Sequence, residues 1–208
     1  FKQKMLAALY AVSFVAAFNE NIVNVALIDI MDAFGVTALT AQWLVTGYMM
    51  VTTLIVTLSA FLYQRLGVRL LLIVASAFLI VGSIGAMVST TFWMLLMFRL
   101  IQSVGTGVFI PTMMSTVLAV APRAKLGTYL SVGGMMITLG PAFGPVVSGL
   151  MVSAWGWRTI FVPTLVAILL TAAVGLRYVS DPEPRSPMLL DALPVALISL
   201  GLVGLIYG

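Results

Sequence analysis

Long apolar stretches dominate the chain and alternate with short polar breaks. A helix needs about 20 apolar residues to cross a bilayer, and seven stretches approach or exceed that length. Continuous apolar runs of this length predict membrane-spanning helices, because half-buried strands would show alternating apolar and polar residues. The predicted helices cover residues 6–31, 42–63, 70–88, 92–119, 127–154, 159–178 and 188–207.

The polar breaks predict how the chain is divided. The longest break, at residues 181–187, holds three prolines, which forbid a continuous helix and make a semi-rigid linker. We therefore predict a bundle over residues 1–178, a linker over 179–187 and a seventh helix over 188–208. The chain starts at Phe1 and stops at Gly208 inside an apolar run, so we expect a piece of a longer protein.

Basic residues fall into alternate breaks, which predicts the orientation in the membrane. One side of the predicted bundle holds eight of the ten bases, and the other side holds Arg158 together with the acids Asp29 and Asp32. Because Lys and Arg collect on the cytoplasmic side, we expect a multi-pass protein of the cell membrane with a cytoplasmic N-terminus. The eight bases are Lys2, Lys4, Arg65, Arg69, Arg123, Lys125, Arg177 and Arg185.

Composition supports the membrane assignment and narrows the chemistry. The chain is 62% hydrophobic and 8% charged, against about 25% charged residues in soluble domains. It has no Cys and no His, which removes thiol catalysis, imidazole metal sites and Ser–His dyads. We therefore expect no enzyme, metal site or cofactor. The net charge of +4 follows from the topology and does not indicate nucleic-acid binding.

Glu20 lies inside the first predicted helix, where an acid is costly and normally faces a bundle interior or an aqueous cavity. Asn24 follows one turn later on the same face, and Asn19 precedes the acid. The functional interpretation is a proton or cation site. The alternative is a polar lock between helices that hydrogen bonds satisfy.

Arg99 lies inside the fourth predicted helix, with Gln102, Ser103 and Thr106 on the same face. Glu20 and Arg99 lie at similar depth, about 14 Å and 12 Å from the outer helix ends at about 1.5 Å per residue. We expect them to pair, directly or through water, in at least one state. Burial favours a neutral acid and a nearby guanidinium favours a carboxylate, which suits proton exchange. The alternative is a structural ion pair.

The fifth predicted helix is rich in small residues and proline. Gly140 and Gly144 form a pair that lets another helix approach closely, and Pro141 and Pro145 each remove a backbone hydrogen bond. One interpretation is close packing with a kink. The other is a hinge or a sealed interface that moves during transport, with Gly149 on the same segment.

Five segments, in order, resemble the motifs of the major facilitator superfamily, and more narrowly those of its fourteen-helix drug:proton antiporters. The helix 1 signature D-x-T-I-V-N-V-A-L-P resembles residues 19–27, and the loop motif G-x-L-A-D-R-x-G-R-K resembles residues 60–69, with Gln64, Arg65, Gly67 and Arg69. Residues 99–111 resemble the helix 4 motif R-x-x-Q-G-x-G-x-G-x-x-x-P, residues 139–149 resemble the helix 5 antiporter motif, and residues 155–161 resemble the segment G-W-R-W-I-F that opens helix 6.

The resemblance implies an all-α fold, a six-helix N-terminal bundle of two inverted three-helix repeats plus one further helix. It also implies a missing second bundle, supplied by the same parent chain or by another copy. The sequence departs from the family at two acids: Asn19 stands at the helix 1 Asp, with Glu20 one residue later, and Gln64 stands at the loop Asp.

Three functions follow as hypotheses. The first is proton-coupled export of lipophilic, cationic drugs by alternating access, with the proton as coupling ion, Glu20, Asn19, Asn24, Arg99 and Gln102 as the binding site, and the loop at residues 64–69 as a gate. The second is a carrier of a specific metabolite, peptide or lipid. The third is a sensor or assembly protein that does not transport. The expected partners are the lipid bilayer and a small lipophilic substrate.

Overall fold

The computed structural model describes residues 2–181 of the 208, and within them the chain is helical. Its elements, in order, are α1 (Lys2–Asn21), α2 (Val23–Phe34), α3 (Ala38–Ala41), α4 (Trp43–Leu66), α5 (Val68–Met87), α6 (Phe92–Val120), η1 (Arg123–Lys125), α7 (Leu126–Trp155), η2 (Trp157–Ile160) and α8 (Phe161–Tyr178). The predicted linker from residue 182 onward and the seventh helix at 188–207 lie outside the described residues.

The described helices fit the predicted spans, with one correction. Five helical stretches are long and apolar enough to cross a membrane, and α1 with α2 makes a sixth if the pair is one span. The predicted helix over residues 6–31 is not continuous, because it bends by 40° between Asn21 and Val23. The chain is therefore a multi-pass membrane protein with a broken first span.

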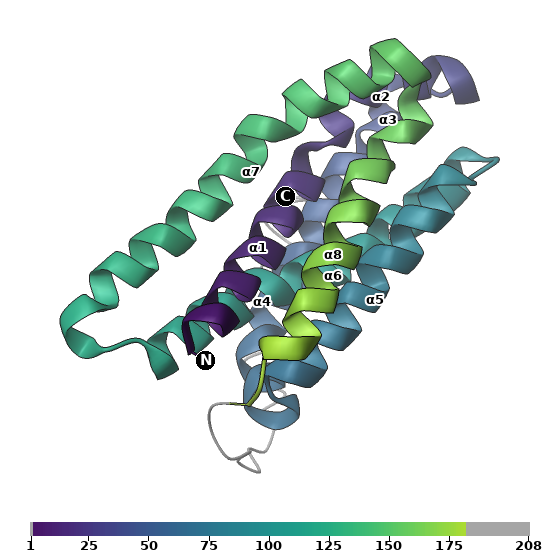
Figure 1. Ribbon diagram of the computed structural model, residues 1–208. Helices are drawn as coiled ribbons and strands as arrows, with labels where there is room; N and C mark the ends of the chain where they lie inside the picture. Colours follow the sequence, from purple (N-terminus) through teal and green to yellow (C-terminus); the bar gives the residue numbers. More distant parts are fainter. Residues whose placement is uncertain (1, 182–208) are drawn as a thin grey trace.

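Local chemistry sets where the helices end. The α4–α5 turn uses Gly67 at φ +79°, a left-handed conformation that glycine adopts without steric cost. At the start of α6, the Thr91 hydroxyl accepts a 3.2 Å hydrogen bond from the Met94 N–H, which caps the helix. These ends bring the α4–α5 turn, the start of α1 and the end of α8 to one end of the bundle (Figure 1).

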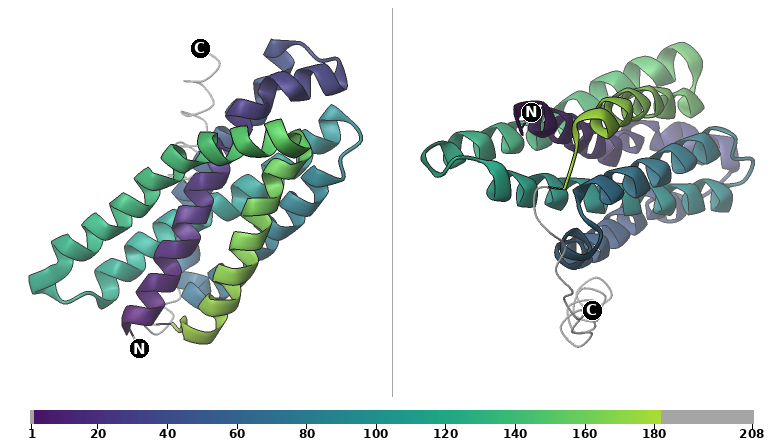
Figure 2. Two further views of the ribbon diagram at one scale, coloured as in Figure 1. Left: turned by 45° about the horizontal axis from the view of Figure 1, so that its top comes forward. Right: turned by 60° about the horizontal axis from the view of Figure 1, so that its bottom comes forward.

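α1 and α6 are the central helices. α1 packs on α7 and α8, whereas α6 packs on α4 and α5, and the two central helices also contact each other. Figures 1 and 2 show α7 along one flank beside α1, with α5 beside α6 and α8. Each central helix thus packs on two helices from the opposite half of the sequence, which is the exchange that two interlocked three-helix repeats would give.

Two apolar clusters fill the interior, and buried polar side chains lie between them. The first cluster joins the start of α1 and α5 to the end of α6, around Leu9, Leu72 and Met113. The second joins α2 to the start of α6 and to η2, around Ile30 and Leu95. Between them lie the end of α1 and the middle of α6, which carry the polar residues singled out in the sequence.

Candidate functional site

The break in the first span is the centre of the site. The last four carbonyls of a helix have no intrahelical partner, so a bend inside a membrane leaves polar groups that other helices must satisfy. Side chains from α6 and α7 do this here. Arg99 of α6 reaches the carbonyls of Asn19 and Glu20, and the Ser148 hydroxyl of α7 donates a 2.6 Å hydrogen bond to the Ile22 carbonyl.

The Arg99 guanidinium is fully buried and surrounded by partners that suit a cation. Its Nη1 donates to the Asn19 carbonyl at 3.1 Å and to Gln102 Oε1 at 2.9 Å, and its Nη2 donates to the Glu20 carbonyl at 3.4 Å. The Tyr48 ring centre lies 4.1 Å away. The negative end of α1 and the face of an aromatic ring both stabilise positive charge, which explains how an arginine is tolerated in the bundle interior.

Further hydrogen bonds extend this contact into a network across four helices. Asn19 Nδ2 donates to the Tyr48 hydroxyl at 3.0 Å, and that hydroxyl lies 2.5 Å from Thr106 Oγ1. Gln102 Nε2 donates to Ser83 Oγ at 2.9 Å. We call this set the polar layer; its members are Asn19, Tyr48, Ser83, Arg99, Gln102 and Thr106, all of them buried.

Two atoms of the polar layer have no partner among the described residues. These are Asn19 Oδ1, an acceptor, and Arg99 Nε, a donor. A buried polar atom without a hydrogen bond costs about 1–3 kcal/mol. These two atoms can therefore hydrogen-bond to a water molecule, a ligand or a side chain that moves.

Glu20 lies beside the polar layer but outside it. The predicted common depth of Glu20 and Arg99 is confirmed, because the guanidinium reaches the backbone of Glu20. The Glu20 carboxylate is half-buried and makes no hydrogen bond or ion pair with the residues that the structure describes. In this state the arginine binds the helix break and leaves the acid available.

The structure does not bring Asn24 to the polar layer. The break at Ile22 interrupts the stripe that a continuous helix would present. Asn24 is exposed, and its Nδ2 donates to Asn21 Oδ1 at 3.4 Å, whereas Gln102 is fully buried against Arg99 and Ser83. Asn24 and Gln102 therefore do not share a surface.

The small residues of α7 form the contact with α1. A Cβ atom placed on Gly140 would lie 2.6 Å from both Ala17 Cβ and the Phe18 nitrogen. One placed on Gly144 would lie 3.4 Å from Asn21 Cβ. The predicted close approach of another helix is thus confirmed, and that helix is α1, just before its break.

The prolines of α7 point away from this contact. Pro141 and Pro145 are exposed, and the helix runs without a break from Leu126 to Trp155. Gly149 is half-buried, and a Cβ there would only touch Val25 at 3.9 Å. The segment packs tightly through one face, while its proline face lies open.

The predicted gating loop holds an acid that comes from elsewhere in the chain. Gln64, Arg65 and Arg69 are exposed around Gly67. Asp181, which follows α8, accepts a 3.1 Å hydrogen bond from the Arg69 N–H through its Oδ1. A carboxylate at a helix N-terminus is stabilising, so the charge missing at Gln64 is present on this turn in another form.

Sequence reasoning missed Tyr48, Ser83, Ser148 and Asp181. Tyr48 is one of two tyrosines in an apolar helix, and the sequence gives no signal that separates it from Tyr63 for a buried hydrogen-bonding role. Ser83 and Ser148 are common residues in membrane helices. Asp181 is 112 residues from its partner, and no local pattern points to that contact.

Known proteins are similar to this chain along nearly all of its length. The sequence model of the Major Facilitator Superfamily matches residues 9–204. An uncharacterized MFS-type transporter, YhcA of Bacillus subtilis, is 35% identical over 207 residues, which are 98% of this chain and 38% of the relative. The lincomycin resistance protein LmrB of Bacillus subtilis is 33% identical over 204 residues, 98% of this chain and 43% of the relative.

A more distant relative and two solved structures extend the comparison. A multidrug resistance protein B homolog of Mycobacterium tuberculosis is 27% identical over 196 residues and covers 94% of this chain and 36% of the relative. A peptide transporter POT in complex with sulfate superposes with a TM-score of 0.77 at 17% identity, covering 98% of this chain and 44% of that one. The inward-open xylose transporter XylE from E. coli gives 0.73 at 13% identity, covering 98% and 56%.

The chain thus spans less than half the length of the curated relatives described above. The two structural likenesses concern the fold alone, because their sequence identities are low.

Proposed function

Because this chain belongs to the major facilitator superfamily, we propose that it is the N-terminal half of a proton-coupled exporter of lipophilic, cationic drugs. The drug cargo is supported by the antibiotic and multidrug resistance names of its relatives. A transporter, rather than an enzyme, is what this family contains. The fourteen-helix antiporter branch fits the motifs along the chain.

One observation carries the proposal: the buried Arg99 guanidinium holds the carbonyls of Asn19 and Glu20 at the break of α1. This contact ties a fixed cation on α6 to the backbone beside a titratable acid. When Glu20 is ionised, its carboxylate competes with these carbonyls for the guanidinium. When Glu20 is protonated, that competition ends and Arg99 returns to the helix break.

In this mechanism a change in the charge of Glu20 changes how α1 is held. A substrate cation acts like a proton, because either one neutralises the carboxylate. The acid then binds the proton or the drug, but not both, which is the requirement for exchange. Asn19, whose Oδ1 has no partner among the described residues, supplies a further acceptor next to the cation.

α7 packs directly on the break of α1, which is the segment that we propose moves. Gly140 and Gly144 hold α7 against the last turn of α1, and Ser148 binds the carbonyl at the joint. A change at the break therefore reaches α7 directly. The turn at Gly67 with Asp181 closes the basic end, which we propose faces the cytoplasm.

The whole activity needs a second bundle. A single six-helix unit does not enclose a central cavity, so we propose that a second bundle completes the transporter, from the same parent chain or from a second copy. The protein would reside in the cell membrane with lipid as its surroundings. A proton is the proposed coupling ion, and the mechanism needs no further cofactor.

The test uses the full-length protein in proteoliposomes with an imposed pH gradient. Proton flux is recorded on adding lipophilic cations and lincomycin to wild type and to Glu20→Gln. The matched control is Asp29→Asn, which neutralises an exposed acid on α2. Substrate-dependent flux that vanishes only in Glu20→Gln supports the proposal.

Other outcomes favour other functions. Flux that survives Glu20→Gln would support the exporter hypothesis but show that Glu20 is not the coupling site. No flux with any cation points to the carrier of a specific metabolite, peptide or lipid, and the panel is then repeated with those compounds. No proton flux with any compound would favour a sensor or assembly protein that does not transport.

A further inference from the structure

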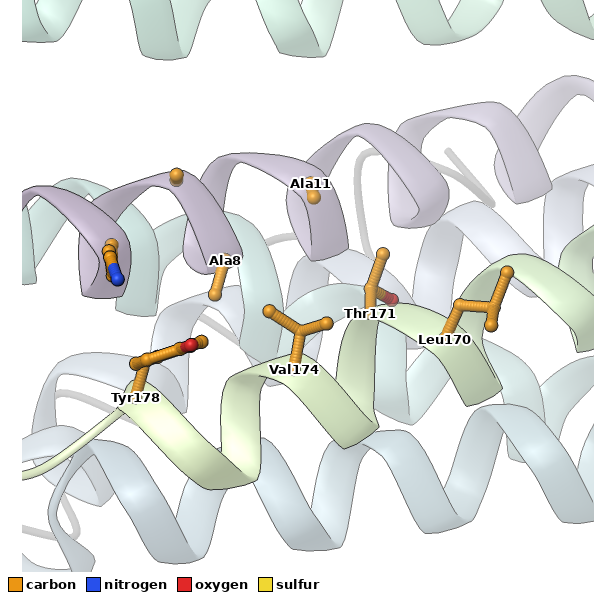
Figure 3. A pocket seen from close by; sticks show the side chains of 8 residues that line it. Ala8, Ala11, Leu170, Thr171, Val174 and Tyr178 are labelled. Atoms are coloured by element: carbon orange, nitrogen blue, oxygen red, sulfur yellow. The ribbon is translucent and has the colours of Figure 1, made fainter.

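A groove of about 400 Å³ runs between the start of α1 and the end of α8. Figure 3 shows Ala8 and Ala11 of α1 facing Leu170, Thr171 and Val174 of α8, with Tyr178 at one end. The groove exists because the α1 wall is built from alanines, whose short side chains leave the space between the two backbones unfilled. It lies toward the start of α1, whereas Arg99 contacts the end of that helix, and it is not part of the transport site proposed above.

The groove has apolar walls. Leu170 and Val174 are 64% and 49% exposed. Away from the Tyr178 end, the one hydroxyl on the walls is that of Thr171, which donates a 2.7 Å hydrogen bond to the Ala167 carbonyl of its own helix. Because the Thr171 hydroxyl is already hydrogen-bonded within its own helix, this part of the groove presents an apolar surface and suits a hydrocarbon chain.

The Tyr178 end of the groove is positively charged. Lys4 Nζ lies 5.2 Å from the centre of the Tyr178 ring, and Arg177 Cζ lies 5.9 Å from the same centre. Neither cation makes an ion pair with a described residue. Two cations that make no ion pair among the described residues lie by one aromatic ring at the end of an apolar groove. Together they form a site with one charged end and one apolar end.

We propose that this groove binds an anionic phospholipid. The headgroup phosphate lies between Lys4 and Arg177, and one acyl chain follows the alanines of α1 toward Leu170. Lys and Arg at a membrane surface attract anionic lipids, and tyrosine rings lie at headgroup level. The volume matches a chain better than a protein helix, whose diameter with side chains is about 10–12 Å.

The experiment places the full-length protein in liposomes that contain phosphatidylglycerol with a photoactivatable acyl chain. After illumination, the labelled peptides are identified by mass spectrometry. The matched probe is phosphatidylcholine with the same acyl chain. We expect phosphatidylglycerol to label residues 7–11 and 170–174, and phosphatidylcholine to label them several times less.

Variants then separate the charge from the space. Each of Lys4→Gln and Arg177→Gln should lower the labelling about fivefold, since one cation near the surface contributes about 1 kcal/mol. Ala11→Leu fills the groove and should lower it without a change of charge. The control is Arg123→Gln with Lys125→Gln, which removes two cations at the same end of the bundle but away from the groove.

Three results would overturn the proposal. Equal labelling by both lipids would make this ordinary annular lipid. Equal loss in the Arg123/Lys125 control would show a general surface charge effect. Absence of lipid label, together with cross-links from residues 188–208 or from the second bundle into the groove, would show that protein covers it. Each variant is first checked for an unchanged elution profile, so that misfolding cannot imitate a loss of binding.

Discussion

Arg99 donates a hydrogen bond of 3.1 Å from Nη1 to the backbone carbonyl of Asn19, across 80 positions in the sequence. A buried charge must be compensated, and here the end of a broken helix does so together with the Tyr48 ring. The break and the arginine depend on each other, because each satisfies what the other leaves unpaired. The first prediction tests this dependence.

Arg99→Lys should disrupt the site although it keeps the charge. A lysine is a point charge and cannot present the planar fork that bonds Asn19, Glu20 and Gln102 together. We expect transport by the full-length protein to fall at least tenfold and the thermal midpoint to drop. Arg158→Lys, which changes an exposed arginine that donates to the Ser89 carbonyl, is the matched control. Wild-type transport in Arg99→Lys would show that charge alone is needed.

Tyr48→Phe should weaken the polar layer without removing the ring. The change deletes the hydroxyl that accepts from Asn19 and lies beside Thr106, and it leaves two buried groups with one partner fewer. We expect a loss of about 1–3 kcal/mol in stability. Chemical denaturation of the purified protein measures it. An unchanged midpoint would mean that water takes the place of the hydroxyl.

Gly140→Ala should push α7 away from α1. The new Cβ would meet Ala17 Cβ and the Phe18 nitrogen at 2.6 Å, and the nitrogen is backbone that cannot turn aside. Overpacking of this kind costs about 1–3 kcal/mol. Gly134→Ala is the control, because a Cβ there meets nothing within 4 Å. Thermal unfolding of the two variants should differ, and equal midpoints would contradict this packing.

Ser148→Ala should loosen the joint of the first span. The hydroxyl binds the Ile22 carbonyl at 2.6 Å, and its loss leaves that carbonyl without this partner. We expect about 1 kcal/mol of destabilisation and faster hydrogen exchange around residues 22–26. Ser153→Ala removes a hydroxyl bonded within its own helix, to Leu150, and should leave exchange at the joint unchanged.

Gly67→Ala should displace Asp181 from the α4–α5 turn. Gly67 has φ +79°, and a Cβ there would lie 2.5 Å from Asp181 Oδ1. Gly156→Ala carries a similar backbone cost at φ +87° but meets nothing within 4 Å. We expect faster exchange of the Arg69 amide in Gly67→Ala only. Identical Arg69 exchange in both variants would mean that Asp181 keeps its contact with the turn.

Much of the fold follows from the sequence because the bilayer imposes a simple rule. Apolar runs of helix length must span, and every backbone group inside must find a hydrogen-bond partner within the protein, most simply within its own helix. This rule predicted the second to sixth spans, and for the first span it predicted the extent but not the break. The 3.6-residue period placed Arg99, Gln102 and Thr106 on one buried face. The small pair Gly140 and Gly144 likewise predicted a close helix contact.

The break at Ile22, the partners of Arg99 and the role of Asp181 were decided by the tertiary structure. A bend is stable only if distant side chains satisfy the freed carbonyls, and Arg99 and Ser148 come from helices about 80 and 126 positions away. The sequence around Tyr48 gives no sign of its role, which depends on the packing of α4 on α6 beside Arg99 and Thr106. Hydropathy reports how one residue interacts with lipid, whereas these contacts depend on how whole helices are placed against each other.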